Sequence, residues 1–407
     1  MVTDLMNAET YFDHASGTPM SEAARRALLR ALEAYGDPLR LHAPGREARR
    51  LLEDSRAELA DALGAQADEI VFTSGGTESV ALGIWGGART LRETGNRILV
   101  SAVEHPAVFG IAHTLENDGM EIVRIPVDGY GRVDLDVYAA EVRKPGTLLA
   151  SIQHANQEVG TMQPVAEAAR LAREAGVVFH TDACLTAGRL PLGPEALGVD
   201  LLSISGRKFG APAGIGALYV RRGVPVAAYP CGDDRERKRR SGMENTPGVA
   251  AMAAAFTDAR SRLADEAARQ WSLTERLRGA IESSIPSARL HGHPTQRVPH
   301  LVCFSIPDLD PEVLLMALDQ QGFRLGGGSL CSGSAHDPSP VLDAMGSPDT
   351  VPLWAATGVS TSEAAVEGLI EILPALVEDL RRMDVASADA LARLRPQDPA
   401  VAAPDTT

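Results

Sequence analysis

The sequence predicts an α/β fold, in which a large domain with a mostly parallel seven-stranded sheet covered by helices is joined to a smaller α+β domain. Short apolar runs alternate with helix-like stretches up to about residue 220, which is typical of such a sheet. After residue 300 the pattern changes to strand, helix, strand, strand and helix. At 407 residues the chain is long enough for both domains.

Two amphipathic helices precede the sheet. A short extended piece and a turn at 11–19 lead into the stretch 20–35, which carries alanines, leucines and a tyrosine on one face and arginines on the other. A loop rich in proline and glycine follows. The second helix runs to about Leu63, where Gly64 stops it.

Seven apolar runs are predicted strands of the large sheet. They are 69–72, 97–100, 121–125, 147–152, 177–181, 200–204 and 214–220. Helical stretches lie between most of them, such as 77–90, 106–118 and 165–175. Helices between short apolar strands indicate a parallel sheet covered on both faces, where ligands bind beyond the carboxyl ends of the strands.

A long helical segment from Gly248 to about Ser283 is expected to link the two domains. It is followed by predicted strands at 301–306, 323–325 and 351–355 and by helices at 311–320 and 362–383. We expect the large domain to span 13–255, the small domain to comprise 1–12 and 256–385, and the Ala-, Pro- and Asp-rich tail 386–407 to be disordered.

Composition excludes several classes of partner. The net charge is -15, from 39 basic and 54 acidic residues, which disfavours binding to nucleic acid or an anionic membrane. No apolar run approaches the roughly 18 residues of a membrane span, and the N-terminus lacks a secretory pattern, so a cytoplasmic location is expected. The basic run 235–240 is either a solvated loop or an edge that binds phosphate or carboxylate.

Two residues just past buried strands suggest a cofactor. Lys208 follows the run 201–206, and Asp182 follows the strand 177–181. Pyridoxal phosphate (PLP) requires a lysine amine that bonds to its aldehyde carbon and a carboxylate that pairs with its pyridine nitrogen. A lysine after a strand is by itself more often a solvated turn residue, so other motifs must support the interpretation.

Further motifs are placed to complete such a site. The segment 73–79, with Gly76 and Thr77, opens a helix and can cradle a phosphate, although an ordinary capped helix start fits equally well. His105, at a strand end before a proline-started helix, can stack on a ring and move protons, or be a packed histidine. Asn156 can donate to the phenolic oxygen of PLP.

The four cysteines are scattered, so neither a metal site nor a disulfide framework is expected. Cys331 lies in the segment 326–334 among four glycines, which indicates a mobile nucleophile. Cys303, inside a strand, is the expected buried hydrophobe, and Cys184 is expected to pack under the cofactor.

Together and in this order, the motifs resemble the cysteine desulfurases of the class V aminotransferase family, which are PLP enzymes of fold type I. The resemblance spans nearly the whole chain. It rests on the segments 11–15, 73–79, 104–105, 156–160, 181–183, 203–208, 240–245, 326–334 and 338–342.

The resemblance implies a homodimer with its active site at the subunit interface and a small amino-acid substrate. L-Cysteine would displace Lys208 from the cofactor, Lys208 and His105 would move protons, and the Cys331 thiolate would attack the substrate sulfur. The products would be alanine and a persulfide on Cys331 that passes to a sulfur-acceptor protein. The implied cofactor-binding residues are Gly76, Thr77, His105, Asn156, Asp182, Ser205, Arg207 and Lys208.

Three departures concern the cofactor. Arg207 stands where the family has a histidine that donates to the phosphate. Met243 replaces a threonine that reaches the partner's phosphate, and the charge of Arg207 can compensate for that lost donor. Leu185 replaces a glutamine that bonds to the phenolic oxygen.

A fourth departure concerns the substrate. Trp354 falls at the position of the family's carboxylate-binding arginine, and an indole has one donor and no charge. Either another arginine (Arg207, Arg324 or one within 235–240) binds the carboxylate, or the substrate is not free cysteine.

Two alternatives to a cysteine desulfurase therefore stay open. One is a PLP-dependent lyase, aminotransferase or decarboxylase of the same fold that acts on a different amino substrate. The other is a catalytically silent scaffold in a sulfur-transfer assembly, which would bind PLP weakly and be colourless.

Overall fold

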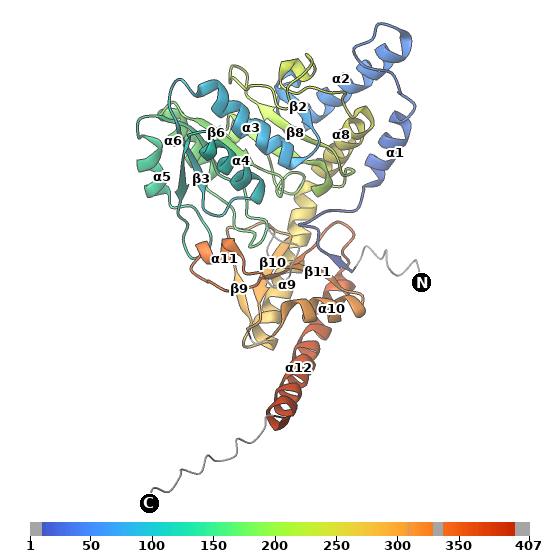
Figure 1. Cartoon of the computed structure of the whole chain (residues 1–407). Coiled ribbons are helices and arrows are strands. Elements are labelled where there is room, and N and C mark those ends of the chain that lie inside the picture. Colours follow the sequence, from blue (N-terminus) through green and yellow to red (C-terminus); the bar gives the residue numbers. More distant parts are fainter. Residues whose placement is uncertain (1–9, 308, 329–336, 395–407) are drawn as a thin grey trace, which may run out of the picture.

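The structure contains two sheets with helices packed against them, which confirms the predicted α/β class (Figure 1). It is a computed structural model that describes residues 10–307, 309–328 and 337–394. One sheet has seven strands and the other has five. In Figure 1 the large sheet and its helices fill the upper part, and the small sheet lies below with α9, α10 and α12.

The large sheet has the strand order β2-β8-β7-β6-β5-β3-β4. Its strands are β2 (Ile70–Thr73), β3 (Arg97–Ser101), β4 (Glu121–Ile125), β5 (Thr147–Ser151), β6 (Val178–Asp182), β7 (Leu201–Ser205) and β8 (Gly216–Val220). β8 runs antiparallel to both of its neighbours, whereas the strands from β7 to β4 are parallel. Each predicted strand of this sheet corresponds to an observed one.

Successive side chains of these strands pack into two different apolar layers. Leu201 belongs to the layer under α3 (Gly76–Leu91) and α4 (Pro106–Asn117), and Leu202 to the layer under the helices of the opposite face. That face is covered by α2 (Ala43–Leu63), α5 (Leu135–Val142), α6 (Val165–Glu174) and α8 (Thr246–Ser261). A strand buried on both faces reads as a continuous apolar run, which is why these strands were recognisable.

Outside these two layers, α1 (Glu22–Ala31) packs against α8, and the short α7 (Pro194–Leu197) precedes β7.

The small sheet has the order β1-β11-β12-β10-β9. Its strands are β1 (Tyr11–Phe12), β9 (Arg289–His291), β10 (Leu301–Ser305), β11 (Arg324–Gly327) and β12 (Leu353–Ala356). Its helices are α9 (Leu263–Ser284), α10 (Pro311–Gln320), α11 (Pro340–Ala344) and α12 (Glu363–Leu394). The first strand of the chain thus pairs with β11, which lies some 300 residues later in sequence.

The helical segments of the C-terminal half differ from the prediction in two ways. The segment 248–283 is two helices rather than one, because the chain leaves helical geometry at Arg262 (φ -116°, ψ 10°). Helix α12 continues to Leu394, past residue 386 where a disordered tail was expected, and its last turns are rich in alanine and leucine, which favour helix.

An apolar cluster joins the two sheets. Val103 and Leu185 from the large sheet's loops belong to the same cluster as Leu301 and Trp354 of the small sheet. The cluster closes one side of the region where strand ends of the large sheet meet the small sheet. Within the described part of the chain, no helix is both long enough and apolar enough to cross a membrane.

Candidate active site

The carboxyl ends of the large sheet's strands bring most of the predicted site residues to one cavity of about 410 Å³. Asp182 and Ser205 are the last residues of β6 and β7, and Lys208 ends the 3₁₀ turn η3 (Gly206–Lys208). The predicted residues that line the cavity are Gly76, Thr77, His105, Asp182, Ser205, Arg207 and Lys208. Parallel strands end at the same edge of a sheet, so residues far apart in sequence meet there.

Lys208 is buried, and its ammonium Nζ donates to the backbone oxygen of Ala15 in the turn after β1. Burial, and after it the nearby Arg207 guanidinium, lower the pKa of Lys208 to about 8. A lysine with a depressed pKa supplies much more neutral amine near physiological pH than an exposed lysine, as a covalent bond to an aldehyde requires.

His105 caps α4, and this fixes the role of each ring nitrogen. Its Nδ1 accepts the backbone N–H of Ala107 at 3.0 Å, so the proton of the neutral ring is on Nε2. Burial is the largest effect on its pKa and lowers it; Asp182 opposes the shift, while Lys208 and Arg207 add to it. A ring that is neutral at neutral pH can accept a proton at Nε2 only through a tautomeric change or by exchange with a neighbour.

Asp182 is held rigidly at the end of β6. It is 9% exposed, and its Oδ1 accepts the backbone N–H of Cys184 at 2.9 Å. A fixed, buried carboxylate at a strand end is suited to pair with a protonated ring nitrogen.

A buried network of hydrogen bonds, which was not predicted from the sequence, lies next to this carboxylate. His180 joins Ser151 at 2.8 Å to Ser203 at 2.9 Å, and Ser79 of α3 donates to Ser203 at 2.9 Å. Burial lowers the pKa of His180 to about 4, so it is a neutral link that ties β5, β6, β7 and α3 together.

Only a glycine at the start of α3 lets the helix approach Cys184 and Ser205 this closely. A Cβ at Gly76 would lie 2.6 Å from Sγ of Cys184 and 3.2 Å from Cβ of Ser205. The N-terminus of this 16-residue helix faces the cavity and carries a partial positive charge. Backbone N–H groups and the helix dipole together form a site for a phosphate.

Two neighbouring amides are placed differently from the prediction. Asn156 is fully buried: its Nδ2 donates to the oxygen of Val103 at 3.0 Å, and its Oδ1 accepts the N–H groups of Glu158 and Val159. It is not among the residues lining the cavity, whereas Gln157 is. Its role in cofactor binding stays a prediction, and the adjacent Gln157 is the amide that sequence reasoning missed.

Cys331 lies outside the described residues, but both flanks of its loop are anchored. The N–H of Gly328 donates to Pro352 at 2.9 Å, and that of Ser339 donates to Thr350 at 3.1 Å. The Ser339 hydroxyl also hydrogen-bonds the carboxylate of Glu158, which directly follows Gln157 of the cavity. The flank at Ser339 therefore lies close to a residue that lines the cavity.

Leu185 and Trp354, two of the residues that differ from the family pattern, lie in the same apolar cluster. Leu185 and Trp354 are 5% and 3% exposed and belong to the apolar cluster between the sheets. The indole Nε1 of Trp354 donates to Oδ1 of Asp13 at 3.0 Å, so its one donor is used inside the protein. Met243, in contrast, is 56% exposed.

The basic run 235–240 is neither an open anion-binding edge nor a solvated loop throughout. Arg235 is buried and forms ion pairs with Asp37, Asp233 and Glu244 at 2.6–3.0 Å. Arg240 pairs with Glu78 of α3 at 2.8 Å. Most of the positive charge of the run 235–240 is therefore already paired with carboxylates of the protein.

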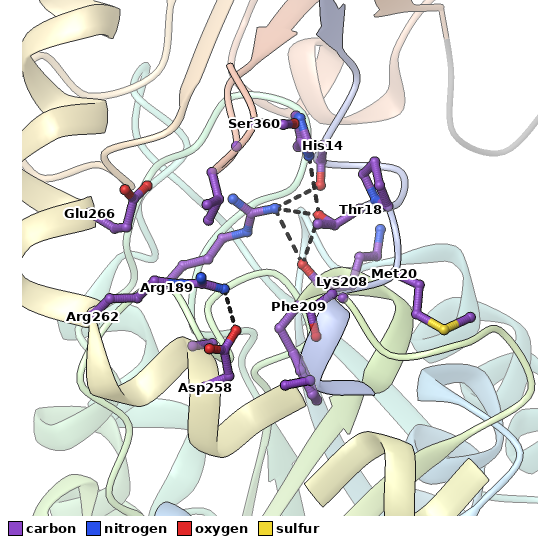
Figure 2. Close-up of a pocket in the computed structure, with 18 of the residues that line it drawn as sticks. His14, Thr18, Met20, Arg189, Lys208, Phe209, Asp258, Arg262, Glu266 and Ser360 are labelled. Atoms are coloured by element: carbon purple, nitrogen blue, oxygen red, sulfur yellow. Dashed lines mark hydrogen bonds and ion pairs between the residues drawn. The ribbon is translucent and has the colours of Figure 1, made fainter. Parts of the chain in front are cut away.

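A second cavity, of about 360 Å³, lies beside the first and shares Lys208 with it. Figure 2 shows Arg189 reaching from this cavity to three oxygens, those of His14 (3.1 Å), Thr18 (2.8 Å) and Lys208 (3.2 Å). Burial lowers the pKa of Arg189 to about 10. This arginine fastens the turn after β1 to the backbone of Lys208.

Comparison with known proteins gives the same family throughout. The profile of the class-V aminotransferase family matches residues 10–367. The chain is 38% identical over 380 residues to a protein of Dictyoglomus turgidum named cysteine desulfurase IscS, covering 92% of this chain and 96% of that protein. It is 37% identical to a Methanosarcina thermophila protein of the same name, covering 93% and 94% of the two chains.

The solved structure of a NifS-like protein superposes with a TM-score of 0.85 at 29% identity, covering 91% of this chain and all of that one. Sequence and structure thus agree over nearly the whole chain: it belongs to the class-V aminotransferase family and, within it, to the cysteine desulfurases.

Proposed function

We propose that this protein is a PLP-dependent cysteine desulfurase that converts L-cysteine to L-alanine, leaving a persulfide on Cys331. One observation carries the proposal: a buried lysine of lowered pKa, a rigid carboxylate and a glycine-opened helix line a single cavity. The names of the relatives supply the substrate and the type of reaction.

The described residues fit the cofactor. Lys208 would hold it covalently, Asp182 would pair with the ring nitrogen, and the start of α3 with Ser205 would hold the phosphate. A Cβ at Gly76 would collide with Cys184, so glycine is what lets the start of α3 approach Cys184 and Ser205 closely, as a phosphate cradle needs. When bound, PLP withdraws electrons from the amino-acid carbon framework, so that sulfur can leave to a soft nucleophile.

The protein's own groups would then bind, orient and move protons. Burial raises the neutral fraction of the Lys208 amine above that of an exposed lysine, and the backbone oxygen of Ala15 holds the amine at the cavity wall. His105 presents Nε2, because Nδ1 is occupied as the helix cap. Lys208 and His105 are therefore the proposed groups that exchange protons with the substrate.

Cys331 is the proposed nucleophile and carrier of sulfur. Its loop leaves β11 at Gly327 and returns at Ser339, whose contact with Glu158 lies one residue from the cavity-lining Gln157. This flank close to the cavity supports delivery of the thiolate to a substrate held there. The persulfide would then pass to an acceptor protein. A free reactive cysteine is kept in a reducing compartment, so the proposal includes a cytoplasmic location.

A homodimer is part of the proposal. Exposed apolar side chains gather on α1 and the loop after it, and a second copy of the chain would cover them. They are Leu29, Leu32, Tyr35, Leu39 and Leu41, which are 51–85% exposed.

The direct test is alanine production from L-cysteine by the purified, PLP-loaded protein. Alanine is the expected product, and Cys331→Ser is expected to keep the cofactor's visible absorbance while it loses persulfide formation. Pyruvate in place of alanine would assign a lyase instead. A colourless protein that does not take up PLP would indicate a silent scaffold.

A further inference from the structure

The proposed reaction needs two anion sites in one cavity, one for the cofactor phosphate and one for the carboxylate of the amino-acid substrate. The start of α3, next to Cys184 and Ser205, provides the first. The location of the second rests on the proposed function and on the charges that line the cavity.

Among the described residues that line the cavity, Arg207 and Lys208 are the basic ones apart from His105. Lys208 is committed to the cofactor, and the neutral His105 carries no fixed charge. Arg207 is exposed toward the cavity and makes no ion pair within the described part of the chain. Arg240, by contrast, reaches the same region but is matched by Glu78 at 2.8 Å.

The guanidinium of Arg207 lies on the side of the turn after β1. Its Nη1 is 3.9 Å from the position that a Cβ would take at Gly17. Its charge contributes, after burial, to the lowered pKa of Lys208 and opposes the raised pKa of Tyr11, and it also acts on His105 and Cys184. The backbone of Arg207 is also tied to this turn, since its oxygen accepts the N–H of Thr18 at 2.9 Å. The guanidinium thus borders the turn that Lys208 touches, whereas the glycine cradle borders Cys184 and Ser205.

Several other polar groups of this corner are already occupied, and the Nε2 of His14, which has no hydrogen-bond partner among the described residues, is buried. The indole of Trp354 donates to Oδ1 of Asp13, and the hydroxyl of Ser16 donates to the same oxygen at 2.9 Å. Arg189 is buried on the far side of the turn, where backbone oxygens and Thr18 accept from its two terminal nitrogens, and its Nε is buried without a hydrogen-bond partner in the part of the chain that the structure describes (Figure 2). An anion that enters between Lys208 and the turn therefore meets Arg207.

We propose that Arg207 binds the carboxylate of the substrate amino acid, in place of an arginine at position 354. A guanidinium presents two parallel N–H donors that match a carboxylate, and an unpaired one carries no competing partner to displace. Arg207 is thus a determinant of specificity for α-amino acids over simple amines. Of the two anions that the sequence analysis allowed for Arg207, this assigns it the substrate carboxylate and not the cofactor phosphate.

The test measures binding rather than turnover, so that it stands even if L-cysteine is not the substrate. The PLP-loaded protein is titrated with L-alanine and with ethylamine, which lacks only the carboxylate, and the shift of the cofactor's absorbance gives each dissociation constant. Arg207→Gln is compared with Arg207→Lys, which keeps the charge, and with Arg25→Gln, an exposed arginine outside both cavities.

We expect Arg207→Gln to raise the L-alanine dissociation constant roughly 10- to 100-fold, the worth of a charge-assisted bidentate contact. Ethylamine binding and PLP affinity should change by less than about twofold in the same variant, and Arg207→Lys should recover part of the loss. Arg25→Gln should match the wild type.

Two results would overturn the proposal. One is an equal loss of L-alanine and ethylamine binding, which would mean that the variant disturbs the site as a whole. The other is a large fall in PLP affinity with unchanged preference for L-alanine, which would assign Arg207 to the phosphate. A wild-type protein that binds L-alanine in this manner but yields no alanine from L-cysteine would refute the proposed function and leave the Arg207 inference standing.

Discussion

The loop 233–244 and the cofactor cavity are both rich in basic residues, yet their charges are used in opposite ways. In the loop, Arg235 alone contacts three carboxylates, and the carboxylate of Glu236 is matched by the buried Arg56 at 2.6 Å. In the cavity, Lys208 donates to a backbone oxygen and Arg207 forms no ion pair within the described residues. Matched charges hold the fold together, and unmatched charges in a cavity are available to a ligand.

The largest effect on the cavity side should come from Lys208→Ala. We expect loss of the visible absorbance of the lysine-bound cofactor and a fall in alanine production of roughly 10⁴-fold, because the chain loses both its covalent anchor and a proton carrier. The measurement is an absorbance spectrum together with a product assay.

The chain has only two other lysines, Lys144 and Lys238, so few other amines could bind the cofactor in place of Lys208. Both are exposed, so Lys238→Ala should keep spectrum and turnover. Borohydride reduction followed by peptide mapping should find PLP on Lys208; a label on either other lysine would contradict the assignment.

The largest effect on the loop side should come from Glu236→Ala. Its carboxylate bonds two nitrogens of Arg56 and the N–H of Phe72, and the side chains of Glu236 and Arg56 are 1% and 2% exposed. Removal leaves the buried guanidinium of Arg56 with only the half-exposed Glu53 as an ion-pair partner, which should lower the free energy of unfolding by about 3 kcal/mol. Denaturant unfolding monitored by circular dichroism measures it.

Glu47→Ala is the matched control, because it breaks the exposed ion pair with Arg50 on the surface of α2. Its unfolding midpoint should stay close to that of the wild type, since exposed pairs contribute little. Equal losses in Glu236→Ala and Glu47→Ala would mean that burial of the pair does not matter.

A pH profile sharpens the contrast further. The pKa of Lys208 is lowered to about 8 by burial and then by Arg207, while Cys184, Asp13 and Asp182 oppose the shift. Only the neutral amine attacks an aldehyde, so PLP uptake by the apoprotein should be slow at low pH and accelerate as the pH rises through about 8.

Arg207→Gln removes one of the causes that lower this pKa, so its uptake profile should move to higher pH. Arg207→Lys keeps the positive charge and should leave the profile near that of the wild type. Stopped-flow absorbance at a series of pH values gives the profiles, and a shift of Arg207→Gln to lower pH would show that the charge of Arg207 is not felt at Lys208.

The same contrast shows what the sequence could predict. Seven of the predicted residues line one cavity, because alternating apolar runs and helices indicate a mostly parallel sheet, whose strands end at one edge. The partners of charged residues were not predictable. Arg56 meets Glu236 across 180 residues and Trp354 meets Asp13 across 341, and no local pattern encodes either pairing.

The direction of individual side chains was also not predictable from the sequence. Asn156 and Gln157 are adjacent amides in one motif, but the backbone turn that Asn156 stabilises turns its side chain inward and leaves Gln157 on the cavity. Likewise, the break at Arg262 lies in a stretch of good helix formers, where tertiary packing outweighs propensity.

The smallest predicted effect concerns the backbone of the charged loop. The turn η4 (Glu236–Lys238) places three consecutive residues at positive φ: 45° for Glu236, 56° for Arg237 and 63° for Lys238. A residue with a Cβ is strained by about 1–2 kcal/mol in this region, whereas glycine is not. The buried contacts of Glu236 hold the turn in place despite that strain.

Lys238→Gly should therefore stabilise the protein by roughly 0.5–1 kcal/mol, after the greater flexibility of glycine in the unfolded chain is subtracted. The side chain of Lys238 is 74% exposed and pairs only with an equally exposed Asp234, so little is lost with it. Lys144→Gly is the control, because Lys144 is not at positive φ and gains only the unfolded-state flexibility, which lowers stability. Thermal unfolding of the two variants should thus shift in opposite directions. A loss in both would mean that the exposed lysine, rather than the backbone of the turn, is what the charged loop requires at this position.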